Sequence, residues 1–175
     1  MFLRFLPAVF AFLLPVLTPL ASAQVSPVSM RVEQVNSSDR DKHTTVQKRS
    51  LKVHLSNSSG QDQTGLRVKY YYFTKDVKDK DVIVKESGEK SADVKARATE
   101  IAETPVVKSS FTDDHFEGGG RNNNKGGRNN NFKAGKKVAA SGDKIVGYGV
   151  QLYSGDKMIA EQFSGPSLKA LVGGK

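Results

Sequence analysis

Three residues in the second half of the chain carry side chains that often bind metal ions. Asp113, His115 and Glu117 are spaced two apart in the stretch DDHFE, so their side chains would share one face of a strand. Carboxylates and an imidazole are a reasonable ligand set for a divalent cation, and a bound cation would support hydrolysis. The same residues also describe a polar strand end that enters a loop. We favour the strand end over a metal-dependent hydrolase because no second group of ligands is evident.

The rest of the sequence offers little for catalysis. It has no Cys and only three His, and it lacks the GxSxG, HExxH and P-loop patterns. The aspartates of Thr74–Val82, TKDVKDKDV, alternate with lysines that would repel a cation, so this stretch is interpreted as a solvated loop. We therefore expect a protein that is not an enzyme and holds no cofactor and no metal.

Four consecutive aromatic residues, Tyr70–Phe73, could form a surface on which sugars or bases stack. Alternation along a strand would bury Tyr70 and Tyr72 in a core and place Tyr71 and Phe73 on the opposite face. We keep Tyr71 and Phe73 as candidate ligand-contacting residues, on the expectation that both are partly exposed. Two later tyrosines have the same status: Tyr148 and Tyr153.

Residues 118–137, GGGRNNNKGGRNNNFKAGKK, form a basic low-complexity segment without a single acid. Gly and Asn do not hold one backbone conformation, so we expect a disordered loop between two strands. Its cations would attract polyanions in a salt-dependent way. The candidate anion or partner contacts are Arg121, Lys125, Arg128, Lys133, Lys136 and Lys137.

The positive charge of the protein is concentrated in this segment. The formal net charge is +9, of which the segment supplies six and Arg4 one, and this leaves +2 for the rest of the chain. The sequence thus describes a nearly neutral domain with one basic loop. Two interpretations remain open: a contact surface for anions, or a spacer that is tolerated because loop length costs little free energy.

Residues 1–23 resemble a cleaved signal peptide, with Arg4, the apolar run Phe5–Leu17 and the small residues Ala21-Ser22-Ala23. Three prolines argue against a retained membrane span. Cys-free export favours a bacterial source, in the periplasm or outside the cell. We therefore expect an acidic polysaccharide, an anionic envelope surface or a protein as partner, and no intracellular nucleic acid.

Residues 24–175 form one domain by length, and their pattern is that of short strands. Leu51, Val53 and Leu55 alternate with polar residues, and Leu66–Thr74 is apolar on both faces at one end, as in a central strand. Lys144–Tyr153 and Lys157–Phe163 flank a turn and predict a hairpin, in which Gly147 and Gly149 leave room for a bulge or a close neighbour.

Two polar stretches are expected to interrupt the strands. We interpret Asn36–Thr45 as a loop and Ser87-Gly88 as a turn, with a further strand at Val94–Ala98. Seven or eight strands result. This count predicts an all-β fold, an antiparallel β-sandwich of immunoglobulin-like arrangement, with a small β-barrel as the alternative.

The order of a signal peptide, LRVKYYYFTKD, a basic Gly-rich loop and IVGYGVQLYSGDKMIAEQFSGPSLKAL resembles uncharacterised exported bacterial proteins with an immunoglobulin-like or fibronectin type III-like β-sandwich. The resemblance implies an exported sandwich and no catalytic residue. We expect a non-enzymatic binding or adhesion module. The alternative is an accessory structural subunit of a bacterial surface or pilus assembly that uses exposed strand edges.

Overall fold

The computed structural model describes residues 26–79, 81–118 and 135–173, which form ten strands and one short helix. No helix among these residues is long and apolar enough to cross a membrane. The elements are β1 (Val28–Asp41), β2 (Thr44–Asn57), β3 (Gln63–Asp76), β4 (Val82–Val94), β5 (Thr99–Glu103), β6 (Val107–Thr112), β7 (His115–Glu117), β8 (Lys136–Val138), β9 (Ser141–Ser154), β10 (Lys157–Phe163) and α1 (Pro166–Lys169).

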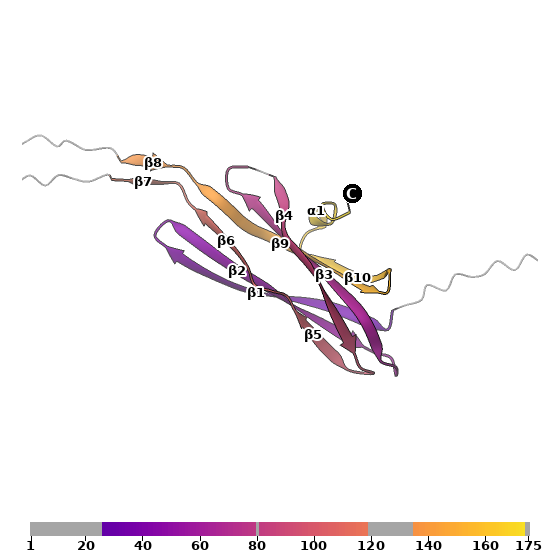
Figure 1. The fold of residues 1–175 in the computed structure, drawn as a ribbon. Helices are drawn as coiled ribbons and strands as arrows, with labels where there is room; N and C mark the ends of the chain where they lie inside the picture. Colours follow the sequence, from indigo (N-terminus) through magenta and orange to yellow (C-terminus); the bar gives the residue numbers. More distant parts are fainter. Residues whose placement is uncertain (1–25, 80, 119–134, 174–175) are drawn as a thin grey trace, which may run out of the picture.

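The strands form two antiparallel layers that face each other (Figure 1). In the first sheet β2 pairs with β1 on one edge and with β5 and β6 in succession on the other. The second sheet has the order β10-β9-β3-β4. A short pairing of β6 with β9 joins the two sheets at one end. The predicted antiparallel β-sandwich is confirmed, and β1 and β4 remain at the edges of the described sheets rather than closing a barrel.

If β5 and β6 count as one interrupted strand, three strands of the first sheet face four of the second. The first sheet then holds the first, second and fifth strands, and the second sheet holds β3, β4, β9 and β10. Three strands that face four make an antiparallel β-sandwich, in which β4 pairs with β3 in the second sheet. The strand count exceeds the expected seven or eight because of that interruption and because of a separate hairpin formed by β7 and β8.

The core lies between the sheets and follows the alternation of the sequence. Leu51, Val53 and Leu55 of β2 are completely buried, and Val150 and Leu152 of β9 face them from the other sheet. Interdigitation of two such inner faces is what stabilises a sandwich. As predicted, β3 is a central strand between β4 and β9, and β9 and β10 form a hairpin.

The expected loop at Asn36–Thr45 is wrong. β1 and β2 continue through it as a long hairpin whose last pair is Asp41 with Thr44, and Lys42 in the turn has a left-handed backbone with φ 46°. The end of this hairpin extends past the core, so most β1 side chains there are exposed. Its polarity reflects the absence of a covering layer, not the absence of a strand.

The expected turn at Ser87-Gly88 and the expected strand at Val94–Ala98 are also wrong. Gly88 lies inside β4, opposite Tyr70, whose hydroxyl group occupies the space that a Cβ at Gly88 would need. The chain instead turns just after Val94, where Arg97 adopts φ 56°. Gly88 therefore makes room for a core side chain and does not reverse the chain.

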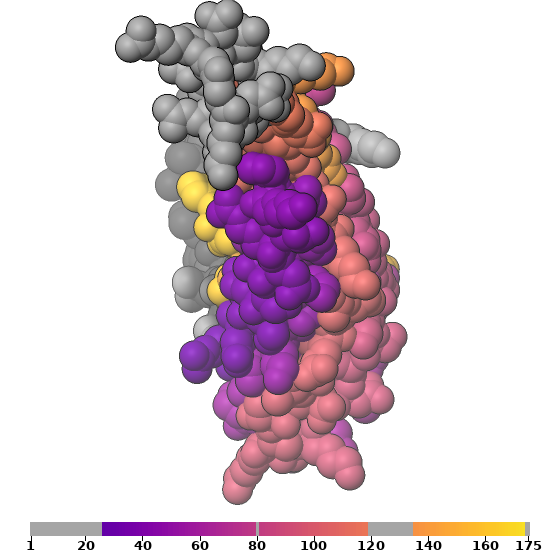
Figure 2. Space-filling model, turned by 90° about the vertical axis from the view of Figure 1, so that its left-hand side faces the viewer, coloured from indigo at the N-terminus to yellow at the C-terminus, as the bar shows by residue number. Residues whose placement is uncertain are grey.

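The C-terminal segment covers part of the outer surface of the second sheet. A Cβ at Gly149 would collide with the ring of Phe163, and one at Gly147 would collide with Leu168 of α1 and with Ser164. Both glycines thus admit the close neighbours that their spacing predicted, and β9 carries an irregularity beside Gly147. In Figure 2 the yellow C-terminal residues border the indigo β1 on one side, while salmon β6 lies on the other.

Candidate functional site

The basic segment is attached to the sandwich through the β7–β8 hairpin. His115 pairs with Val138 and Glu117 with Lys136, so the two ends of the segment leave from neighbouring strands. Gly118 begins the connection with φ 77°. Figure 1 shows this hairpin projecting past the tip of β1 and β2. Lys136 and Lys137 are exposed on β8, whereas four predicted contacts lie outside the described residues: Arg121, Lys125, Arg128 and Lys133.

An aspartate holds the β8 side of this hairpin. The backbone N–H of Ala140 donates a 2.6 Å hydrogen bond to Oδ1 of Asp114, and Nζ of Lys137 lies 3.5 Å from Oδ2. The Ala140 hydrogen bond is the main reason why the pKa of Asp114 lies below its usual value, and Lys137 lowers it further. Asp114 therefore stays ionised and partly neutralises one of the cations of the segment.

The three residues considered as a possible metal set, Asp113, His115 and Glu117, do not converge. The carboxylate of Asp113 lies 3.3 Å from the guanidinium of Arg40 and 4.0 Å from Nζ of Lys144. Its backbone N–H donates to the carbonyl of His43. Across the part of the chain that the structure describes, no three His, Asp or Glu side chains are placed to share a metal ion. Asp113 instead ties the hairpin base to β1.

His115 is stacked on His43 from the tip of the β1–β2 hairpin. The two rings are 3.9 Å apart and only 5° from parallel. Nδ1 of His115 is 2.9 Å from the carbonyl of Asp113, and Nε2 is 3.2 Å from the carboxylate of Glu117. Both nitrogens thus face acceptors, which favours the doubly protonated ring. The Asp113 carbonyl first, and Glu117 second, raise the pKa of His115.

The two aromatic candidates on β3 have different environments. Tyr71 is partly exposed on the outer face of the second sheet, as expected. Phe73 is completely buried, so the expected exposure of this residue is wrong. It is paired with Gly147, over which Leu168 of α1 lies. The C-terminal segment therefore removes Phe73 from any ligand surface.

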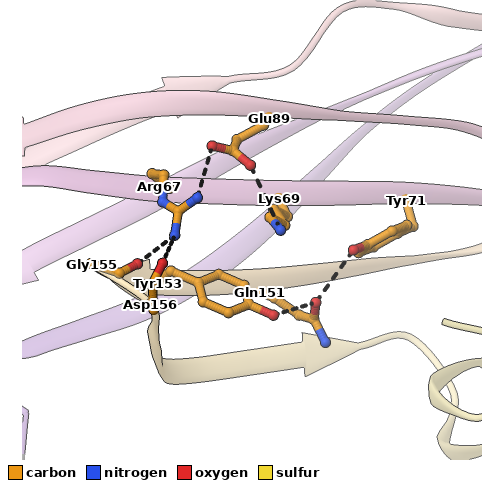
Figure 3. A network of polar contacts seen from close by, with 8 residues as sticks. All are labelled: Arg67, Lys69, Tyr71, Glu89, Gln151, Tyr153, Gly155 and Asp156. Carbon is orange, nitrogen blue, oxygen red and sulfur yellow. Dashed lines mark hydrogen bonds and ion pairs between the residues drawn. The ribbon is translucent and has the colours of Figure 1, made fainter. Parts of the chain in front are cut away.

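Tyr71 belongs to a polar network on the outer face of the second sheet that was not expected from the sequence (Figure 3). Its hydroxyl donates to Oε1 of Gln151 at 3.4 Å, and the hydroxyl of Tyr153 donates to the same oxygen at 3.2 Å. Arg67 and Lys69 lie over the ring of Tyr153, at 5.8 and 5.0 Å from its centroid. The pairing of β3 with β9 brings these residues together from separate parts of the chain.

One signal could have revealed the network. In GVQLYS, Gln151 and Tyr153 alternate with the apolar Val150 and Leu152, so they share the outer face of β9. The register that sets them beside Tyr71 is not readable from the sequence. Tyr148, the other late tyrosine kept as a candidate, is buried in the core, so its expected exposure is wrong.

Comparison with known proteins does not assign the chain to a family. No protein-family model matches it, and no curated protein matches it.

Proposed function

We propose that this chain is an exported, non-enzymatic binding module in which the basic segment contacts an anionic surface or partner. The observation that carries the proposal is the attachment of the segment. Both of its ends arise from one paired hairpin, which Asp113 ties to Arg40 of β1, while Asp114 holds Ala140 just before β9. The described chain begins at Ser26, at the opposite end of the sandwich (Figure 1). The hairpin that carries the segment therefore projects from the sandwich at the end far from Ser26.

The distribution of charge favours the basic segment, and not the sandwich, as the part that attracts an anionic partner. The segment supplies six of the net charges in the sequence. Around its base, the cations Arg40 and Lys144 face Asp113, and Lys137 faces Asp114. Because these pairs are exposed, each adds little to stability. They do reduce the field of the body, so attraction for a polyanion is concentrated in the segment.

The proposal is tested by retention on immobilised heparin over a salt gradient. We expect the triple variant Arg121→Gln, Lys125→Gln and Arg128→Gln to elute at clearly lower salt, because fewer counterions are released on binding. The matched control removes the same charge from exposed positions elsewhere: Lys90→Gln, Lys95→Gln and Lys157→Gln. If both triple variants elute alike, net charge and not the segment governs binding, and the proposal is wrong.

The alternative, an accessory subunit of a surface assembly, draws support from the second sheet. β4 is an edge strand, and Ile83 near its start is 59 % exposed. Such an edge can pair with a strand of another protein. Copurification with envelope or pilus components that is lost in Ile83→Lys, but kept in the segment variant, would favour this function.

A further inference from the structure

The outer face of the second sheet carries a second surface that is independent of the basic segment. Its centre is Gln151 on β9, whose Oε1 accepts hydrogen bonds from Tyr71 on β3 and from Tyr153 on β9. Figure 3 shows the two phenol groups pointing toward this amide from opposite sides. All three side chains are partly exposed.

The register shows that the two tyrosine rings lie along the sheet. Tyr71 is opposite Gly149, and Tyr153 is opposite Arg67. The Cα atoms of the tyrosines are therefore roughly 14 Å apart along the strand direction. Both hydroxyls nevertheless reach one amide oxygen, so each ring must lean along the strands toward the other.

The charges of this surface cancel. Glu89 on β4 lies 3.7 Å from Arg67 and 3.8 Å from Lys69. Arg67 also contacts Asp156 at 3.2 Å and donates to the carbonyl of Gly155. Two cations thus face two carboxylates, and little net field remains to attract a polyion. A ligand for this face is selected by hydrogen bonding and shape.

The hydrogen-bonding groups of the network suit hydroxyl groups. Oε1 of Gln151 accepts both phenol protons. Its Nε2 makes no hydrogen bond within the described residues, so this nitrogen offers two N–H donors. The phenol oxygens of Tyr71 and Tyr153 keep lone pairs that can accept. Phe163 lies over Gly149, next to Tyr71, and adds a third aromatic side chain at one end.

We infer that this face binds an uncharged saccharide chain. Sugar rings combine an apolar C–H face, which packs on aromatic rings, with hydroxyl groups that both donate and accept. Tyr71 and Tyr153 supply the rings, and Gln151 supplies donors between them. The neutral charge of the surface matches a ligand without uronate or sulfate groups. This site does not depend on the proposed function of the basic segment.

Tyrosine fluorescence provides the readout, because the chain has five Tyr and no Trp. Neutral hexasaccharides of glucan, xylan, mannan and chitin type are titrated into the full-length protein, with NMR chemical shifts as a second measurement. We expect at least one to bind at millimolar concentration or better, with at least about tenfold weakening in Tyr153→Ala and Gln151→Ala. Tyr153→Phe keeps the ring and is expected to lose less.

Two controls keep the inference separate from folding and from the basic segment. Phe116→Ala removes an exposed aromatic residue at the far hairpin and is expected to leave saccharide binding unchanged. Deletion of residues 119–134 and high salt are expected to change nothing, in contrast to heparin retention. The inference is overturned if no neutral hexasaccharide binds more tightly than about 10 mM, if Tyr153→Ala binds as well as the unchanged protein, or if only acidic saccharides bind.

Discussion

At the scale of single residues, His115 joins the hairpin of the basic segment to the sandwich. Its ring stacks on His43, and its two nitrogens face the Asp113 carbonyl and the Glu117 carboxylate. Other charged groups near this contact are Asp114 and Lys137. The state with both nitrogens protonated satisfies both acceptors, which a neutral imidazole cannot do.

This geometry predicts a pH-dependent stability. Because the pKa of His115 is raised above 6.5 in the folded state, the stabilisation is complete below about pH 6.5 and is lost as pH rises through the higher folded pKa. His115→Asn should therefore destabilise the protein more at about pH 5.5 than at about pH 9. Urea unfolding at both pH values measures the difference. Glu117→Gln should lower the pKa of His115 in an NMR titration, and an unchanged pKa would contradict the assignment.

A buried hydroxyl pair gives a second prediction at this scale. Oγ1 of Thr104 accepts from the backbone N–H of Leu51 at 2.9 Å and lies 2.6 Å from the hydroxyl of Tyr72. Thr104→Val removes the hydroxyl group that both of these groups contact, and it should cost about 1–3 kcal/mol of unfolding free energy, against about 1 kcal/mol for Tyr72→Phe. Thr104→Ser keeps the hydroxyl and should cost less than Thr104→Val. Urea denaturation gives the values; a Thr104→Val cost no larger than that of Tyr72→Phe would contradict this role.

At the scale of elements, the C-terminal segment depends on two positions of β9 without side chains. Phe163 packs over Gly149, and Leu168 of α1 packs over Gly147. The backbone of Ser164 is held in addition by Tyr148, to whose carbonyl its N–H donates at 3.0 Å. The outer face of the second sheet is thereby divided into a covered end, which includes Phe73, and an open end around Gln151.

A methyl group added at Gly147 of β9 should disturb the covered end of this face. Gly147→Ala forces Leu168 and Ser164 to move, and we expect a loss of about 1–3 kcal/mol in unfolding free energy together with faster proteolysis of the C-terminal segment. Gly60→Ala is the matched control, because nothing lies within 4 Å of its added Cβ, and surface changes of this kind stay within about 0.5 kcal/mol. Equal stability of the two variants would show that the segment does not depend on this packing.

At the scale of the whole molecule, the sandwich is nearly neutral, and most of the net positive charge of the chain lies in a single insertion, residues 118–137. The ends of the insertion lie on paired strands, so the fold itself requires only a short connection there. Long connections cost little free energy, because the closure penalty grows slowly with length. Shortening the insertion should therefore alter anion binding without lowering the stability of the sandwich.

Replacing residues 119–134 by a short Asn-Gly turn should raise the unfolding free energy by roughly 1 kcal/mol, because a shorter loop costs less entropy to close. Heparin retention should fall in the same variant. The urea midpoint and the m value measure the first effect. A loss of stability greater than about 1 kcal/mol would mean that the segment packs on the sandwich.

Much of the fold was predictable because burial and alternation coincide. The inward residues of β2, β3 and β9 alternate clearly, and β9 and β10 flank a Gly-containing turn, so their faces and their pairing could be inferred. The loop expected at Asn36–Thr45 failed because polarity reports exposure, and an exposed hairpin is polar while still being a strand. The turn expected at Ser87-Gly88 failed for a related reason. A glycine that makes room for a large neighbour, here Tyr70, cannot be distinguished in the sequence from a glycine that forms a turn.

The sequence by itself determined the all-β class, the central position of Leu66–Thr74 and the concentration of charge in residues 118–137, because periodicity and composition are local properties. Only the tertiary structure decided that Phe73 is covered and that Tyr71, Gln151 and Tyr153 meet. The tertiary structure also places Arg40 and Lys144 beside Asp113, so this carboxylate faces two cations and does not converge with His115 and Glu117. These contacts depend on strand register and on the path of the C-terminal segment, which arise from packing between distant parts of the chain.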